Sequence, residues 1–424
     1  MSTTKTILAL AALALGATAL AAQQAPATHS PQAAAILGDI RYLASDSLDG
    51  RLTGSPQNDS AAAYLSRRFK RLGLRPGGDD GGYLQHWTVN PTSGTRAAGV
   101  AGRATENVIG ILPGSSRALA GEDIVVGAHF DHLGNGPFGS MAHGDSAHLM
   151  HPGADDNASG TAGVLEIARI LAARRPRPAR TIVFVLFSGE EEGDLGSAWY
   201  VDHPAVAMDS TYAMLNLDMV GRMRATRLLV LGVLSAKEWP SLLDSVDAPY
   251  HLDVHASGTG WGPSDQNSFY AKHVPVLHFF TDVHADYHAP GDTWDKINAD
   301  GIETVARLVA DMAWRLAGRG ASLTYVNAPP PMMAAGERAY LGSIPDMTSE
   351  PGGVLLSGVT AGSPADSGGL KAGDVITGIG GDSVANLVDM QNALVKHHPG
   401  DTVDIRVRRG DQTLTLPVTL GRRQ

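Results

Sequence analysis

The chain has 424 residues, too many for one ordinary hydrophobic core, so its length predicts two or more domains. Apolar residues make up 43% of the chain, which excludes a wholly disordered protein. The formal net charge of −10 argues against nucleic-acid binding, because that requires clustered Lys and Arg. Because the sequence contains no Cys, disulfides, thiolate metal sites and a lipid-anchored lipoprotein are excluded.

The first residues have the pattern of a secretory signal peptide. Lys5 precedes an apolar run over 7–17, and "ALA" at 19–21 resembles a small-x-small cleavage site. The run is short for a membrane-spanning helix, and no later stretch is long and apolar enough for one. We therefore expect removal of residues 1–22 and export of a soluble protein to the periplasm or the medium, with no membrane span after signal removal.

The next region alternates apolar strands with helices. The 3.6-residue apolar period predicts a helix over 160–175 between the first two strands. Further helices are expected over 33–46, 57–72 and 302–317, and buried strands over 123–129, 181–189, 212–219 and 274–281. This order predicts an α/β domain, over residues 23–325, whose mostly parallel central sheet is flanked by helices.

The composition of the chain and its predicted secondary structure change near the C-terminal end. Residues 326–336 contain a Pro-rich segment, which is typical of a linker. Short strands separated by Gly-rich turns follow it. We therefore expect a second, small β-rich domain over 337–424.

Polar side chains gather where the predicted strands end. In open α/β sheets, ligands bind at the carboxyl ends of the strands. The residues concerned are His129 and Asp131 after the first strand, Glu190, Glu191 and Glu192 after the second, Asp218 after the third, His288 after the fourth, and "GADDNASG" (153–160) before the helix. So many carboxylates without nearby Lys or Arg require a cation, and imidazole together with carboxylate suits zinc, with manganese or cobalt as alternatives.

Each of these features also has an ordinary structural interpretation. Asp155, Asp156 and Asn157 could only cap a helix, and the run of glutamates could be a solvated loop. Taken together at one end of one sheet, they favour a metal site. The remaining histidines are assigned separately: His278 to the core, His284 to a weaker metal candidate, and His132, His143, His148 and His151 to a solvated loop. For these last four, a place in the cleft and a further weak metal contact are the alternatives.

Five motifs in this order resemble the dizinc aminopeptidases of metallopeptidase family twenty-eight. They are "GAHFDH", "GADDNASG", "SGEEEGDLGS", "LNLDM" and "DYHAPGDT", and the resemblance covers about residues 33 to 320. It implies a zinc exopeptidase fold with two zinc ions as cofactors. It assigns His129 and Asp218 to one zinc and Glu191 and His288 to the other, with Asp156 bridging the two.

The resemblance also implies roles for residues that do not bind metal. Asp131 is the carboxylate that orients His129. Glu190 is the general base, which takes a proton from the zinc-bound water and passes it to the leaving amine. Tyr287 matches a position where some members have a Tyr that stabilises the oxyanion, although a buried, hydrogen-bonded Tyr is an equally ordinary interpretation. Glu192 has no role in the pattern and is expected to be solvated or to stabilise its loop.

The second domain resembles a PDZ domain of the bacterial protease type. "GSPADSGGLKAGDVI" (362–376) is its most specific motif, and a helix is expected over 386–400. Such domains bind extended chains by adding a strand to a sheet edge. The resemblance implies that the backbone amides of Tyr340–Ser343 could hold the C-terminus of a peptide. A purely structural appendage is the alternative.

We therefore expect an exported zinc-dependent exopeptidase that acts on peptides, most simply an aminopeptidase. Two alternatives remain. Arg222 could anchor a substrate carboxylate, which would make the same site a carboxypeptidase or dipeptidase. Alternatively, the protein could be a PDZ-driven peptide-binding protein whose metal site is structural.

Overall fold

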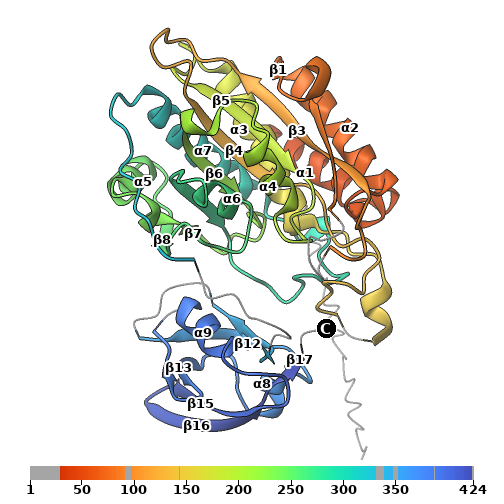
Figure 1. The fold of residues 1–424 in the computed structure, drawn as a ribbon, viewed down its shortest axis with the longest axis vertical. Helices are drawn as coiled ribbons and strands as arrows, with labels where there is room; N and C mark the ends of the chain where they lie inside the picture. The colour runs from red at the N-terminus through yellow and green to blue at the C-terminus, as the bar shows by residue number, and fades with distance from the viewer. Residues whose placement is uncertain are drawn as a thin grey trace, which may run out of the picture.

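The computed structural model describes residues 29–90, 97–142, 144–330, 339–346, 352–385 and 387–422 (Figure 1). The predicted signal peptide and much of the predicted linker lie outside these ranges. None of the helices within them combines the length and the apolar character needed to cross a membrane.

The chain forms a larger domain followed by a smaller one. The elements of the larger domain are α1 (Pro31–Leu43), η1 (Asp46–Arg51), α2 (Pro56–Arg71), β1 (Arg75–Pro76), η2 (Asp79–Gly81), β2 (Leu84–Thr88), β3 (Ala104–Leu112), β4 (Asp123–His129), η3 (Gly144–His148), η4 (Ala154–Ser159), α3 (Gly160–Ala173), β5 (Thr181–Phe187), α4 (Leu195–Asp202), η5 (Met208–Ser210), β6 (Thr211–Leu217), β7 (Arg227–Leu231), η6 (Val233–Ser235), α5 (Trp239–Asp247), β8 (Asp253–Ser257), α6 (Gln266–Tyr270), β9 (Val276–Phe280), η7 (Trp294–Lys296) and α7 (Ala299–Gly318). Those of the smaller domain are β10 (Ala339–Tyr340), β11 (Ser343–Pro345), β12 (Val354–Val359), α8 (Pro364–Ser367), β13 (Val375–Ile379), β14 (Asp382–Ser383), α9 (Leu387–Leu394), β15 (Thr402–Arg409), β16 (Gln412–Thr419) and β17 (Gly421–Arg422).

The larger domain is built on one mixed sheet with the strand order β1-β3-β5-β4-β6-β9-β7-β8, and β2 pairs with β3. Its central strands β5, β4, β6 and β9 are parallel, while β3 and β7 join them antiparallel. The predicted mostly parallel sheet is confirmed for these central strands. Strand β3 was not predicted from the sequence, because the polar Glu106 and Asn107 interrupt an otherwise apolar strand.

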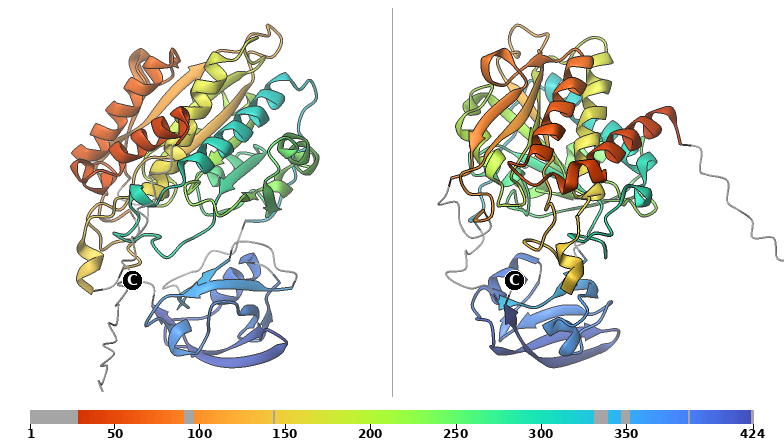
Figure 2. Two further views of the ribbon diagram at one scale, coloured as in Figure 1. Left: turned by 180° about the vertical axis from the view of Figure 1, so that it is seen from behind. Right: turned by 90° about the vertical axis from the view of Figure 1, so that its right-hand side faces the viewer.

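Both faces of the sheet are covered by helices. Helices α1, α2, α3 and α7 lie on one face, and α4 and α6 lie on the other (Figures 1 and 2). Along β4, Ile124 and Val126 pack into the core on the first face, while Val125 packs with Tyr200 and Phe269 on the second. Because both faces of the strand are buried, its sequence is continuously apolar.

The predicted helices are confirmed, with shifts of a few residues at their ends. Ser30 begins α1 because its side chain accepts a hydrogen bond from the backbone of Ala33. Ser55 caps α2 in the same way, and Asn298 caps α7.

The smaller domain is an antiparallel β structure with strand order β11-β12-β13-β15-β16 and its own apolar core. Its helix α9 ends at Leu394, earlier than the predicted end at 400. The residues that follow form turns, because Pro399 and Gly400 disfavour further helix.

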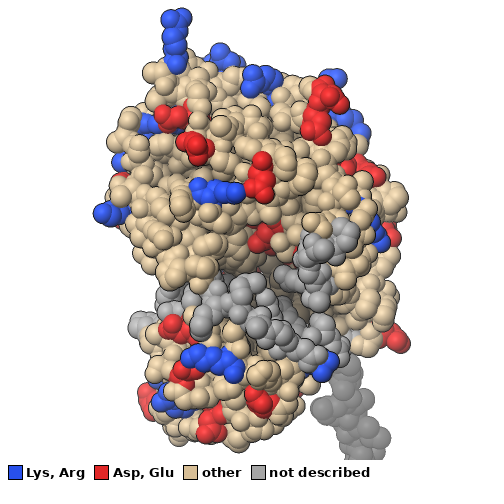
Figure 3. Space-filling model, viewed as in Figure 1, with Lys and Arg blue, Asp and Glu red and all other residues tan. Residues whose placement is uncertain are grey.

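An ion pair joins the two domains. Arg227, the first residue of β7, lies 2.6 Å from Asp346 just after β11, measured between Nη2 and Oδ1. The smaller domain lies on the side toward which η3 projects (Figures 1 and 2). The surface of the larger domain is hollowed on the side that faces the smaller domain, and acidic atoms lie at the upper margin of the hollow (Figure 3).

Candidate metal centre

The parallel strands bring the predicted metal ligands to one edge of the sheet. His129 is the last residue of β4, and Asp218 directly follows β6. Strand β4 lies between β5 and β6. The chain therefore continues from β4 to a strand on one side of it and then crosses to a strand on its other side. Such a switch in strand order opens a crevice at the carboxyl ends of the strands, where ligands bind.

The carboxylate of Asp156 lies between two pairs of predicted ligands, with one oxygen toward each pair. Asp156 Oδ1 lies 3.4 Å from His129 Nε2, which in turn lies 3.4 Å from Asp218 Oδ1. Asp156 Oδ2 lies 3.0 Å from His288 Nε2, which lies 3.1 Å from Glu191 Oε2. All five predicted ligands therefore converge, with Asp156 between the other two pairs.

The unsatisfied atoms of these side chains fit a bound cation. Neither ring nitrogen of buried His129 has a hydrogen-bond partner among the described residues, and Asp218 Oδ1 also has none. Ligand atoms ~2.0–2.1 Å from a tetrahedral zinc lie ~3.3 Å apart, which is close to the separations found here. Imidazole and carboxylate are the ligands that zinc takes when thiolates are absent.

Asp131 organises the strand ends behind the ligands. Its Oδ1 lies 3.6 Å from His129 Nδ1, and its two oxygens accept the backbone N–H groups of Glu190 and Glu191, both at 3.3 Å. Thr53 Oγ1 lies 3.2 Å from the same carboxylate and 2.7 Å from that of Glu192, so its one hydroxyl hydrogen is shared between the two. Asp131 thus fixes the main chain of the Glu run as well as facing the imidazole of His129.

Glu190 lies at the edge of the ligand cluster, with Oε2 3.9 Å from His129 Nε2. Burial raises the pKa of Glu190 well above its usual range, the imidazole of His129 opposes this, and the carboxylates of Asp194 and Asp218 add to it.

His288 and its neighbour Tyr287 lie beside the predicted ligands Asp156 and Glu191. His288 Nδ1 lies 2.8 Å from the carbonyl oxygen of Gly139, which turns Nε2 toward Asp156. Burial alone would lower the pKa of His288, but the neighbouring carboxylates, that of Glu191 first, raise it to about 10. The Tyr287 ring stacks on His288 with 3.9 Å between ring centres, and burial raises the pKa of Tyr287 well above its usual range. Tyr287 therefore stays a hydrogen-bond donor.

Two supporting residues were missed by the sequence analysis. Asp292 Oδ2 accepts the backbone N–H groups of Asp155 and Asp156, at 2.9 and 3.0 Å. The fully buried guanidinium of Arg51 donates to the carbonyl oxygens of Gly153 and Asp156, at 2.6 and 3.3 Å. Both residues therefore hold the backbone of η4. The only local signals were their places in "DYHAPGDT" and "SLDGRL".

Several residues lie in environments other than those expected. His132 and His151 are fully buried, so their assignment to a solvated loop was wrong. Glu192 is 5% exposed, so its solvated interpretation was also wrong, and Thr53 Oγ1 donates a hydrogen bond to its carboxylate over 2.7 Å. These burials depend on segments that meet only in the folded chain.

The other histidines follow the expectations more closely. His148 is exposed, and His278 is buried in β9 as predicted. His284 Nε2 lies 3.1 Å from Asp155 Oδ2 rather than beside a predicted ligand. His143 lies outside the described residues.

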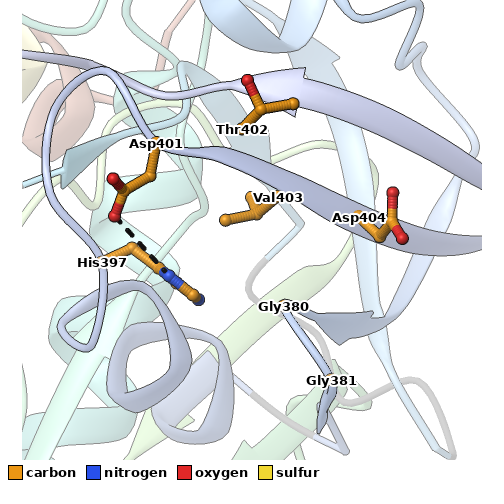
Figure 4. A pocket seen from close by; sticks show the side chains of 7 residues that line it. All are labelled: Gly380, Gly381, His397, Asp401, Thr402, Val403 and Asp404. Carbon is orange, nitrogen blue, oxygen red and sulfur yellow. Dashed lines mark ion pairs between the residues drawn. The ribbon is translucent and has the colours of Figure 1, made fainter.

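A separate polar hollow of about 410 Å³ lies in the smaller domain (Figure 4). Its lining includes His397 and Asp401, whose Nδ1 and Oδ2 are 4.0 Å apart. Among the described residues, groups of three or more side chains that could hold a metal ion occur only in the larger domain: His129 with Glu190 and Asp218, and His132 with Asp156 and Glu191. The candidate metal centre is therefore placed there.

The fold and its cluster of predicted ligands define an α/β domain with a candidate metal centre, joined to a small β domain. Residues 107–313 match peptidase family M28, and residues 339–420 match the PDZ domain family. The chain thus contains a peptidase family M28 domain and a C-terminal PDZ domain.

Individual relatives agree with this assignment. A probable leucine aminopeptidase of Arthroderma benhamiae is 30% identical over 223 residues, covering 49% of this chain and 56% of the relative. Aminopeptidase YwaD of Bacillus subtilis is 31% identical over 219 residues, covering 49% and 44%. The chain thus spans about half the length of these relatives. A Zn-dependent exopeptidase from Parabacteroides distasonis has a similar fold, with a TM-score of 0.55, 18% identity, and coverage of 66% of this chain and 96% of that one.

Proposed function

We propose that this protein is a two-zinc aminopeptidase that removes N-terminal residues from peptides. The observation that carries the proposal is the carboxylate of Asp156, whose two oxygens face His129 and His288 on opposite sides. A carboxylate placed in this way is suited to bridge two metal ions. His129 and Asp218 would hold one ion, and Glu191 and His288 the other.

When bound, two zinc ions would supply an activated water and polarise the scissile carbonyl. The protein's own groups carry the proton. Glu190, whose Oε2 lies 3.9 Å from His129 Nε2, takes it from the attacking water and returns it to the leaving amine. The hydroxyl of Tyr287 donates a hydrogen bond to the developing oxyanion.

The alternatives differ in the substrate end that the site recognises. The two curated relatives described above are named aminopeptidases, which supports recognition of a free amino end. A carboxypeptidase needs a free cation for the substrate carboxylate, and the predicted cation Arg222 is already engaged by two carboxylates. The placement of Glu190 beside the ligands argues against a purely structural metal.

The test is hydrolysis of one short peptide in free, N-acetylated and C-amidated forms, with and without a chelator and with zinc restored. An aminopeptidase cleaves the free and amidated forms, fails on the acetylated form, and loses activity to the chelator. Selective loss on C-amidation would overturn the proposal in favour of a carboxypeptidase. Zinc binding without cleavage of any form would support a binding protein.

We also propose that the protein is exported, on the basis of its N-terminal sequence. The test is mass spectrometry of the mature N-terminus after expression in a bacterium with an intact export pathway. A new N-terminus near residue 23 in an extracytoplasmic fraction is expected. An intact N-terminus on cytoplasmic protein would contradict this.

We further propose that the PDZ domain binds peptide C-termini. Strand β11 lies at the end of its sheet and pairs with β12, and Gly342 before it has a φ of 79° that suits a tight amide-lined loop. Binding of free and C-amidated peptides to the full chain, measured by fluorescence anisotropy, tests this. Equal affinity for both forms would contradict it.

A further inference from the structure

His132 makes a close contact with the predicted ligand Glu191. His132 itself has no role in the family pattern. His132 is fully buried in the loop after β4, and its Nδ1 lies 2.7 Å from Glu191 Oε1. This is shorter than any other described contact between a His and a predicted metal ligand. A buried contact of this length between a ring nitrogen and a carboxylate is a strong hydrogen bond.

The fold holds the imidazole of His132 in a fitted slot. The ring lies against Gly153, where a Cβ atom would come within 2.5 Å of the ring atoms Cγ and Cδ2. Gly153 also has a φ of 58°, which favours glycine. The ring of His288 meets that of His132 edge-on, with 5.7 Å between the ring centres. The orientation of His132 is therefore set by the backbone around it.

The direction of the hydrogen bond follows from its acceptor. A carboxylate that binds a metal carries no proton, so it only accepts hydrogen bonds. Nδ1 of His132 must therefore carry the hydrogen that Glu191 Oε1 receives. Nε2 of His132 has no hydrogen-bond partner in the described part of the chain. Burial alone would raise the pKa of Glu191, but His288 and the hydrogen bond from His132 lower it below its usual range.

The two oxygens of Glu191 are thus used differently. Oε1 accepts from His132, while Oε2 lies 3.1 Å from His288 Nε2, at the predicted metal position. We propose that His132 is a positioning residue that engages one oxygen of Glu191 and leaves the other to bind the metal ion shared with His288. This inference rests on the two-zinc site of the proposed function.

Loss of the His132 hydrogen bond should weaken metal binding at only one of the two metal positions. His132 contacts Glu191, whereas the other position is formed by His129 and Asp218, and Asp131 faces His129 there. Each position then has one neighbouring side chain behind a ligand: Asp131 lies 3.6 Å from His129 Nδ1, and His132 is within hydrogen-bond distance of Glu191. Removal of such a partner commonly weakens metal binding by ~10–100-fold.

The experiment is a zinc titration of the full chain after metal removal, against a competing chelator. His132→Ala removes the donor, whereas His132→Asn keeps an N–H donor close to the place of Nδ1. His151→Ala is the matched control, because His151 is also a buried His of this loop but contacts Ser140 Oγ, at 2.8 Å, and no predicted ligand. Circular dichroism of each metal-free variant verifies folding, and His132→Leu replaces the Ala variant if that fails to fold.

We expect His132→Ala to weaken one of two zinc equivalents by about 10–100-fold and to leave the other unchanged. His132→Asn should recover most of this loss, and His151→Ala should bind both equivalents as the wild type does. Unchanged binding by His132→Ala, equal weakening of both equivalents, or an Asn variant as weak as the Ala variant would each overturn the inference. If the wild type binds two equivalents but cleaves no peptide, the proposed function fails while this comparison still decides the role of His132.

Discussion

The guanidinium of Arg222 forms an ion pair with the buried carboxylate of Asp292, with 3.2 Å between Nη2 and Oδ1. The same nitrogen lies 3.3 Å from Asp286 Oδ2, and the Arg222 side chain is only 14% exposed. A cation shared by two carboxylates is poorly placed to bind a third from a substrate. Arg222 therefore supports the loop that carries His288 rather than the substrate.

Replacement of this cation should change stability rather than specificity. We expect Arg222→Gln to lower the free energy of unfolding by roughly 1–3 kcal/mol, because it leaves buried Asp292 without its cation. The ratio of kcat/KM values for free and C-amidated peptides should stay unchanged. A rise in KM confined to peptides with a free carboxylate would instead make Arg222 a substrate anchor.

Glu190 should be needed for the reaction but not for metal binding. In Glu190→Gln the side chain keeps its shape but cannot accept the proton, so kcat should fall by ~10²–10⁴-fold. Zinc content, measured by atomic emission, should equal that of the wild type. Glu192→Gln is the neighbouring control and should stay active, because an amide oxygen can still accept the hydrogen bond of Thr53. Unchanged peptide hydrolysis by Glu190→Gln would show that the catalytic assignment is wrong.

Asp292 should determine how well the bridging carboxylate is held. Asp292→Ala removes the acceptor of two backbone N–H groups, those of Asp155 and Asp156. We expect zinc affinity to fall by ~10–100-fold in a chelator competition assay. Asp286→Ala is the matched control, since Asp286 shares Arg222 but has no described hydrogen bond to η4. Equal losses in both variants would indicate a general effect of breaking the ion pairs.

A carboxyl group far from the metal centre should make stability depend on pH. Asp123 begins β4 and is fully buried, and burial raises its pKa from 3.8 to about 7, partly offset by a hydrogen bond from Thr211. The folded protein then binds this proton more tightly than the unfolded chain does. The contribution of Asp123 to stability is therefore present below about pH 4 and is lost as the pH rises toward 7.

Urea unfolding of the chelated protein between pH 4 and pH 7 tests this. The free energy of unfolding of the wild type, relative to Asp123→Asn, should decrease across that range. Asn is the appropriate replacement because its amide oxygen can still accept from Thr211. Parallel pH profiles for the two proteins would show that Asp123 ionises normally.

Local patterns predicted the main elements of this protein well. Helix α3 and the four central strands were visible because their apolar residues repeat with the period of the element or run continuously. The edge strand β8 was not predicted, since a short, partly exposed strand carries a weak apolar pattern. Its neighbour β7 was also not predicted, although three of its residues are buried. The end of α9 was placed too late although Pro399 marks it.

The sequence by itself determined the mostly parallel sheet and placed the predicted metal ligands near one edge of it. Residues that directly follow parallel strands lie at the same edge of the sheet, whatever the loops between them do. Only the tertiary structure decided the partners of three polar residues: His132 with Glu191, Glu192 with Thr53, and Arg222 with Asp292. Each of these contacts joins segments at least 59 residues apart, so no local period or spacing encodes it.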